Sequence, residues 1–136
     1  MIRTLILSFA LSFIWIAVAE QFTWNSTASA CPVGWYYITS KQPAKGDLVL
    51  LRNPLKEYAA GPGDTIRTTP EGSYINGVLF PHSEIPDGSP YQPYPYRTLV
   101  LQDDQYWMLG RNRLSLDSRY QGPIPGCELW KVVKRW

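Results

Sequence analysis

The sequence predicts an all-β domain of antiparallel strands, arranged as a coiled sheet or barrel, that follows one N-terminal apolar helix. Six Trp and nine Tyr among 136 residues favour strands, and twelve Pro with ten Gly disfavour long helices beyond the N-terminus. After residue 30, no segment repeats its apolar residues at the helical period. With 45% apolar and 18% charged residues, the chain is expected to fold around a single core.

Residues 1–20 are predicted to be a signal or membrane-anchor segment, and residues 21–136 the folded domain. Residues 5–19 are almost uninterruptedly apolar and follow Arg3. Fifteen helical residues span about 22 Å, less than the hydrocarbon thickness of about 30 Å, and Ala17-Val18-Ala19 fits a cleavage pattern. Two outcomes stay open: a domain on the outer, periplasmic side of the inner membrane, held through residues 5–19, or a soluble periplasmic domain.

Short β-rich runs bounded by turn residues follow this segment. The turn residues include Asn76-Gly77 and Asp103-Asp104, both tight enough for hairpins. Residues 81–95 contain five prolines and cannot form a central strand; they form either an extended loop near a substrate groove or an ordinary surface excursion. The predicted strands are residues 34–39, 48–52, 65–69, 73–80, 97–102, 105–109 and 128–134.

Composition disfavours several classes of function. A net charge of +2 is too small to indicate nucleic-acid binding, and one histidine excludes a multi-histidine metal site. Cys31 and Cys127 belong to no metal-ligand cluster, and they either pair or remain two buried thiols. We therefore expect no metal, no cofactor and no nucleic-acid partner.

Two segments carry residues suited to nucleophilic catalysis. Ser29 lies among small residues just before Pro32, which leaves its hydroxyl uncrowded. Lys56 precedes a run of small residues and the turn 62–64, Pro-Gly-Asp. Each has an ordinary alternative, a solvated loop serine and a surface lysine, so neither is decisive alone.

Taken together, these segments resemble the type I signal peptidase family, which are Ser/Lys membrane endopeptidases. The Ser-x-x-Pro nucleophile motif is matched at residues 29–32, and Lys56 stands six residues before Pro-Gly-Asp, as the family's general base does. Gly-Asp at 46–47 and Asn-Gly at 76–77 also match. The last family motif is matched by Gly110, Asn112, Arg113, Ser115, Asp117, Ser118, Arg119, Gly122 and Pro125.

The resemblance implies a role for each matched residue. Ser29 is the nucleophile and Lys56 the base that removes its proton, with Ser115 orienting the lysine. The Thr27 hydroxyl and the Ser29 N–H hold the oxyanion, and Asp117 with Arg119 forms an ion pair that braces the site wall. A base must be neutral, but only about 0.04% of an ordinary lysine is neutral at pH 7, so Lys56 is expected to be buried.

Departures from the motif place the chain nearer to the small conjugative-transfer peptidases of the TraF type. Arg111 replaces an Asp, the stretch 110–115 is one residue short, and only residues 65–109 stand where many relatives insert a second domain. The expected partner is a precursor protein or pilin-like substrate cleaved after small residues. Alternatives are a transpeptidase that closes a cyclic pilin, a non-catalytic binding or assembly module of a secretion or conjugation apparatus, and a Ser-His-Asp triad using His82.

Overall fold

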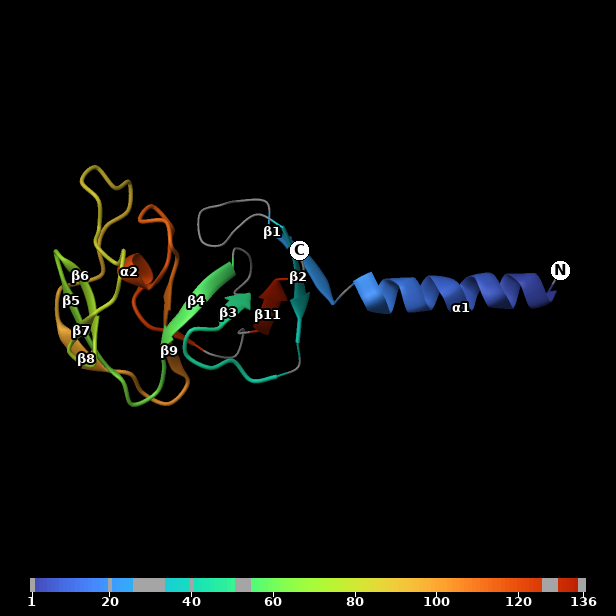
Figure 1. The fold of residues 1–136 in the computed structure, drawn as a ribbon, viewed down its shortest axis with the longest axis horizontal. Coiled ribbons are helices and arrows are strands. Elements are labelled where there is room, and N and C mark those ends of the chain that lie inside the picture. The colour runs from blue at the N-terminus through green and yellow to red at the C-terminus, as the bar shows by residue number, and fades with distance from the viewer. Residues whose placement is uncertain are drawn as a thin grey trace.

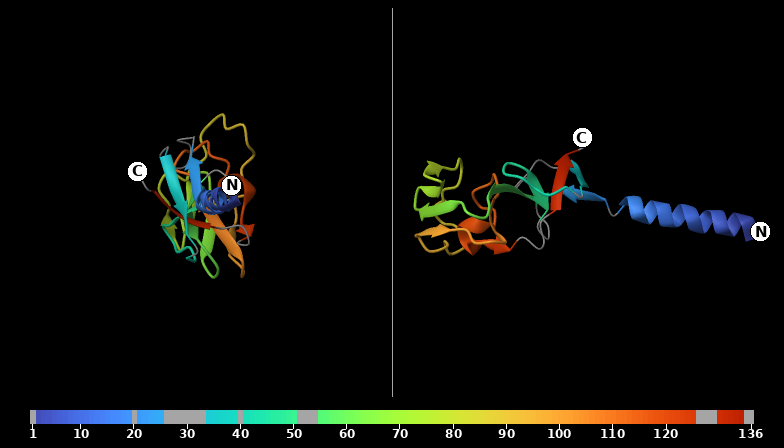
Figure 2. Two further views of the ribbon diagram at one scale, coloured as in Figure 1. Left: turned by 90° about the vertical axis from the view of Figure 1, so that its right-hand side faces the viewer. Right: turned by 90° about the horizontal axis from the view of Figure 1, so that it is seen from below.

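The structure is a computed structural model that describes residues 2–19, 21–25, 34–39, 41–50, 55–125 and 130–134. Figure 1 shows a β domain from which one long helix, α1 (Ile2–Ala19), extends, and the right-hand view of Figure 2 shows this helix standing clear of the strands. None of the helices formed by these residues combines the length and the apolarity of a membrane crossing. Membrane association through residues 5–19 stays a prediction.

The β domain contains two antiparallel sheets, and a short helix, α2 (Ser118–Gln121), lies between the ninth and tenth strands in the chain. The mostly β, antiparallel fold class is confirmed. The larger sheet has the order β1-β2-β11-β3-β4-β9-β10 and comprises β1 (Phe22–Asn25), β2 (Gly34–Ile38), β3 (Leu48–Leu50), β4 (Leu55–Ala60), β9 (Gln105–Leu109), β10 (Ile124–Pro125) and β11 (Trp130–Lys134). The smaller sheet has the order β7-β6-β5-β8 and comprises β5 (Thr65–Thr69), β6 (Gly72–Ile75), β7 (Val78–Leu79) and β8 (Thr98–Val100).

Two chain segments cross between the sheets side by side. One joins β4 to β5 and the other joins β8 to β9. Gly63 N donates to Leu101 O over 2.9 Å, and Leu101 N donates to Asp64 O over 2.9 Å, so the two crossings are hydrogen-bonded to each other.

The Asp64 carboxylate stabilises this crossover. It accepts hydrogen bonds from Lys45 Nζ at 2.7 Å, Asn76 Nδ2 at 2.8 Å and Gly61 N at 2.9 Å. Burial alone would raise the pKa of Asp64, but these hydrogen bonds outweigh it and lower the pKa below the ordinary value of 3.8. Asn76, with φ of 50°, also forms the turn between β6 and β7, so the predicted Asn-Gly hairpin is confirmed.

Two local predictions are wrong. Asp103-Asp104 does not close a hairpin, because β8 pairs with β5 while β9 pairs with β4; the turn instead redirects the chain from one sheet to the other. Residues 55–60 lie outside every predicted strand but form β4, where burial between β3 and β9 overrides the weak strand preference of Lys, Glu and Ala.

The core is shared between the sheets through β4. One cluster contains residues of both sheets, including Ile66, Trp107 and Leu109. A second cluster, Val49, Tyr58, Met108 and Ile124, occupies a face of the larger sheet. A register shift between Tyr58 and Ala60 lets β4 contribute side chains to both.

Candidate active site

Strand β4 carries Lys56 into the interior. Lys56 lies opposite Val49 of β3, and Tyr58, two residues along, lies opposite Met108 of β9. Side chains on a strand alternate between faces, so Lys56 shares a face with the cluster of Val49, Tyr58 and Met108. Only 3% of Lys56 is exposed. The burial expected for a general base is therefore observed, and it disfavours the charged form of the amine.

Ser115 lies beside the Lys56 amine. Lys56 Nζ donates a hydrogen bond to Ser115 Oγ, and only 4% of Ser115 is exposed. The serine is held in a turn in which its N–H donates to Asn112 O over 3.0 Å. Two residues predicted to belong to the site, separated by more than fifty positions in sequence, are thus brought together.

Gly110 makes room for Ser115. A Cβ at position 110 would lie 2.4 Å from Ser115 Oγ, 2.6 Å from Ser115 Cβ and 3.3 Å from Asp117 Oδ2. The first two distances are shorter than atoms of a folded protein tolerate, so the serine keeps its position only because residue 110 has no side chain. This contact gives a physical reason for the glycine that begins the 110–115 loop.

Asp117 and Arg119 form a buried ion pair, whose side chains are 0% and 1% exposed. Asp117 Oδ2 accepts from Arg119 Nη2 at 2.6 Å and from Gly110 N at 2.7 Å, and Asp117 Oδ1 accepts from Arg119 Nε at 2.9 Å. Asp117 is also the N-cap of α2, accepting from Arg119 N at 3.0 Å. The carboxylate and guanidinium therefore fix both ends of the loop that carries Ser115.

The guanidinium of Arg119 extends this network to the proline-rich segment. Its Nη2 donates to Gly110 O at 3.1 Å and to Asn112 O at 2.7 Å, while its Nη1 donates to His82 O at 3.1 Å. His82 has φ of 56°, which is unusual for a residue other than glycine. One buried side chain thus holds residues 81–95 against the Ser115 loop.

Tyr58 presents a neutral hydroxyl on the Lys56 face. Burial raises the pKa of Tyr58 above its ordinary 10.0, and the nearby Tyr106 and Asp64 raise it further. The phenol accordingly stays protonated at neutral pH. The ring packs against Tyr106, and the hydroxyl lies next to Gly61, so Tyr58 adds no negative charge to the face of β4 that carries Lys56.

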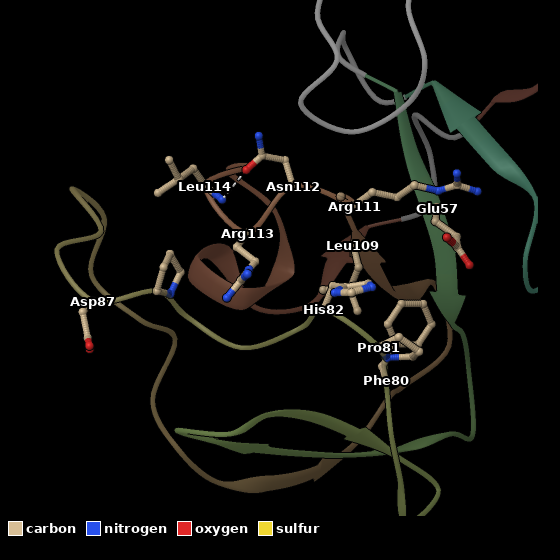
Figure 3. Close-up of a pocket in the computed structure, with 12 residues that line it drawn as sticks. Glu57, Phe80, Pro81, His82, Asp87, Leu109, Arg111, Asn112, Arg113 and Leu114 are labelled. Atoms are coloured by element: carbon tan, nitrogen blue, oxygen red, sulfur yellow. Dashed lines mark hydrogen bonds between the residues drawn. The ribbon is translucent and has the colours of Figure 1, made fainter.

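A cleft opens between the proline-rich segment and the Ser115 loop (Figure 3). Its volume is about 960 Å³. Residues 80–82, 86 and 87 line one side, residues 110–114 the other, and Leu109 with Glu57 completes it. Of the two alternatives for residues 81–95, this supports the loop beside a groove.

Ser29 and Thr27 lie outside the described residues, as do Cys31 and Cys127, so the distance from Ser29 to Lys56 and the pairing of the cysteines stay predictions. Sequence reasoning offered a groove beside residues 81–95 as one alternative, but it missed the second wall at residues 110–114, the position of Glu57 in the cleft and the His82 carbonyl as an Arg119 acceptor. The only sequence signal for Glu57 was its place next to Lys56, which on a strand means the opposite face.

Comparisons with known proteins identify the family of the chain. The chain matches a family model described as "Signal peptidase, peptidase S26" over residues 1–134. It is similar to a probable signal peptidase I-2 of Synechocystis sp. (strain ATCC 27184 / PCC 6803 / Kazusa), with 30% identity over 99 residues, covering 62% of this chain but only 44% of that protein. It is also similar to the plasmid transfer protein TraF of Escherichia coli, with 24% identity over 140 residues, covering 80% of this chain and 79% of that protein. A crystal structure of a signal peptidase I from Enterococcus faecalis V583 aligns with a TM-score of 0.49 and 23% identity, covering 71% of this chain and 100% of that one.

Proposed function

The chain belongs to the signal peptidase family, peptidase S26, and on this premise we propose that it is a serine endopeptidase with Ser29 as nucleophile and Lys56 as general base. The observation that supports this most is the buried Lys56 amine hydrogen-bonded to Ser115. A surface lysine would stay protonated at neutral pH and could not accept a proton, whereas a buried one is shifted toward the neutral form.

In the proposed reaction, neutral Lys56 removes the proton of Ser29 as its oxygen attacks the scissile carbonyl. The Ser29 N–H and the Thr27 hydroxyl hold the resulting oxyanion. Protonated Lys56 then gives its proton to the leaving amine, and a water activated by the same lysine hydrolyses the acyl-enzyme. Ser115 keeps the amine aimed at the nucleophile throughout, and the Asp117–Arg119 pair keeps Ser115 in place.

We propose that the substrate is an exported precursor, cleaved after a small residue while bound in an extended conformation. The similarity to a plasmid transfer protein supports a pilin-like or conjugative-transfer precursor. In this proposal, residues 1–20 anchor the chain and residues 21–136 work on the outer face of the membrane.

The proposal is tested by co-expressing the chain with pilin-type precursors and measuring the mass of the product. Lys56→Met replaces the amine by an apolar chain of similar length and is expected to lower cleavage about 10²–10⁴-fold, the usual contribution of a general base. Ser29→Ala is expected to do the same. Lys41→Met, at an exposed position, is the control that keeps activity.

Wild-type processing by both Ser29→Ala and Lys56→Met would refute the dyad. The product mass also identifies the fate of the acyl-enzyme, because a cyclised product is one water lighter than the hydrolysed one.

A further inference from the structure

The cleft between residues 80–87 and 110–114 does not open onto the Lys56 amine. Glu57 lines the cleft and Lys56 does not, and neighbouring residues of a strand point to opposite faces. Gly110 separates the cleft from the Lys56 side of the strand. It lines the cleft, while a Cβ added to it would point at Ser115. The cleft therefore lies on the reverse side of the strand that carries the proposed base.

The cleft has the size and surface of a binding site. Its volume of about 960 Å³ is at the upper end of the range for ligand sites. The floor is Leu109, which is 2% exposed, and the walls present Phe80, Pro81 and Leu114, the last 55% exposed. An apolar floor between two loops suits an extended peptide better than a compact polar ligand.

The charged side chains in the cleft indicate which kind of peptide it would bind. Arg113 is already paired with Glu84 at 3.0 Å, whereas Arg111 is exposed and makes no ion pair or hydrogen bond with any residue in the described part of the chain. Figure 3 shows Arg111 and Glu57 at one end of the cleft and Asp87 at the other end, away from Arg111. The exposed guanidinium is complementary to a carboxylate, which it can bind with two parallel hydrogen bonds.

We propose that this cleft is an exosite that holds an extended, carboxylate-bearing segment of the substrate polypeptide, with Arg111 binding a carboxylate of that segment. The proposal rests on the proposed peptidase function for the identity of the occupant. Arg119 ties both walls together through His82 O and Asn112 O, so a bound segment also restrains the loop that carries Ser115.

The exosite can be tested by binding, without cleavage. The probes are two short fluorescein-labelled peptides, one alternating Ala with Glu and the other alternating Ala with Lys. Binding of each peptide to the protein is measured by fluorescence anisotropy. The wild type is expected to bind the Glu peptide at least tenfold more tightly, a ratio typical of a charge-assisted contact. Arg111→Gln is expected to remove that preference, and Arg111→Glu to reverse it.

Two control variants locate the binding. Arg67→Gln removes an exposed arginine of β5, which stacks on Tyr74 in the other sheet, and is expected to leave the preference unchanged. Lys56→Met removes the proposed base but none of the cleft lining, so it is expected to bind the Glu peptide as the wild type does.

Equal affinity for the two peptides in the wild type, or equal losses in Arg67→Gln and Arg111→Gln, would overturn the exosite. Self-association of the wild type that Arg111→Gln abolishes, with no peptide bound, would assign the cleft to a second copy and also overturn it. Because Lys56→Met separates cleavage from binding, failure of the peptidase proposal would appear as intact processing by that variant, whatever the binding result.

Discussion

Replacing Gly110 by alanine tests whether the packing of one loop controls the lysine. The new methyl group would lie 2.4 Å from Ser115 Oγ and 2.6 Å from Ser115 Cβ, so Ser115 has to move. The backbone of Gly110 is not in the left-handed region, and the effect therefore comes from the clash alone. Overpacking of this kind costs about 1–3 kcal/mol of the free energy of unfolding.

The substitution is expected to lower the catalytic rate as well as the stability. A shift of about 1 Å in a positioning group can lower a rate about 10²-fold, and Ser115 is hydrogen-bonded to the Lys56 amine. We expect kcat to fall about 10–100-fold while KM changes little. The assays are cleavage of a pilin-type precursor and urea denaturation of the same preparation.

Two further variants make the test specific. Gly77→Ala, with φ of 85° and nothing within 4 Å of the added methyl, loses about 1–2 kcal/mol through backbone strain but is expected to keep kcat. Combining Gly110→Ala with Ser115→Gly removes the clash and is expected to recover stability without recovering activity. A folded Gly110→Ala protein with wild-type kcat would refute the view that Ser115 orients Lys56.

The remaining predictions concern the ion pair, the crossover and the histidine. Arg119→Met leaves the Asp117 carboxylate buried without its partner and is expected to cost about 3–5 kcal/mol in urea denaturation; a loss below 1 kcal/mol would contradict the bracing role. Because the folded-state pKa of Asp64 is lowered, its carboxylate stabilises the fold above the unfolded-state pKa and loses this effect as the pH falls through the folded-state pKa. Asp64→Asn is accordingly expected to be less stable than the wild type at pH 7 by about 1–3 kcal/mol and to match it near pH 2, and a constant difference would contradict the assignment. His82→Gly relieves a positive φ while keeping the carbonyl that Arg119 binds, so unchanged processing and equal or greater stability are expected, whereas lost processing in a folded variant would favour the triad.

Much of the strand layout was predictable because local chemistry determines it. Residues 65–69 and 105–109 combine β-branched or aromatic residues with turn residues at their ends, and both are strands with the predicted bounds. Asn76-Gly77 specifies its hairpin through positive φ angles. By contrast, Leu55–Ala60 became a strand through burial between two neighbours, which local sequence does not encode.

The part of the site that was predictable is the part in which residues of different family motifs contact each other. Lys56 and Ser115 were expected together from the family motifs, and they are hydrogen-bonded. A groove beside residues 81–95 was one of the two alternatives, but its second wall was not predictable, because that wall depends on Arg119 reaching the carbonyl of His82, a residue whose own side chain plays no part in that contact. Main-chain acceptors carry no signature in the side-chain sequence.

The hydrogen-bonded segments at Gly63 and Leu101 lie where the larger sheet, which carries Lys56, meets the smaller sheet. The spacing of Lys56 and Ser115 depends on the larger sheet, whereas the length of a hairpin in the smaller sheet can vary. The smaller sheet and the proline-rich segment are joined to the larger sheet through these two adjacent segments, through the Asp64 carboxylate and through the contact of Arg119 with His82 O. The β6–β7 hairpin carries neither Lys56 nor Ser115, so a change in its length that keeps the Asn76 contact with Asp64 is expected to leave the spacing between the lysine and its serine partner unaltered. A reporter placed after Gly77, with Asn76 kept in place, is therefore expected to leave the Lys56–Ser115 hydrogen bond intact.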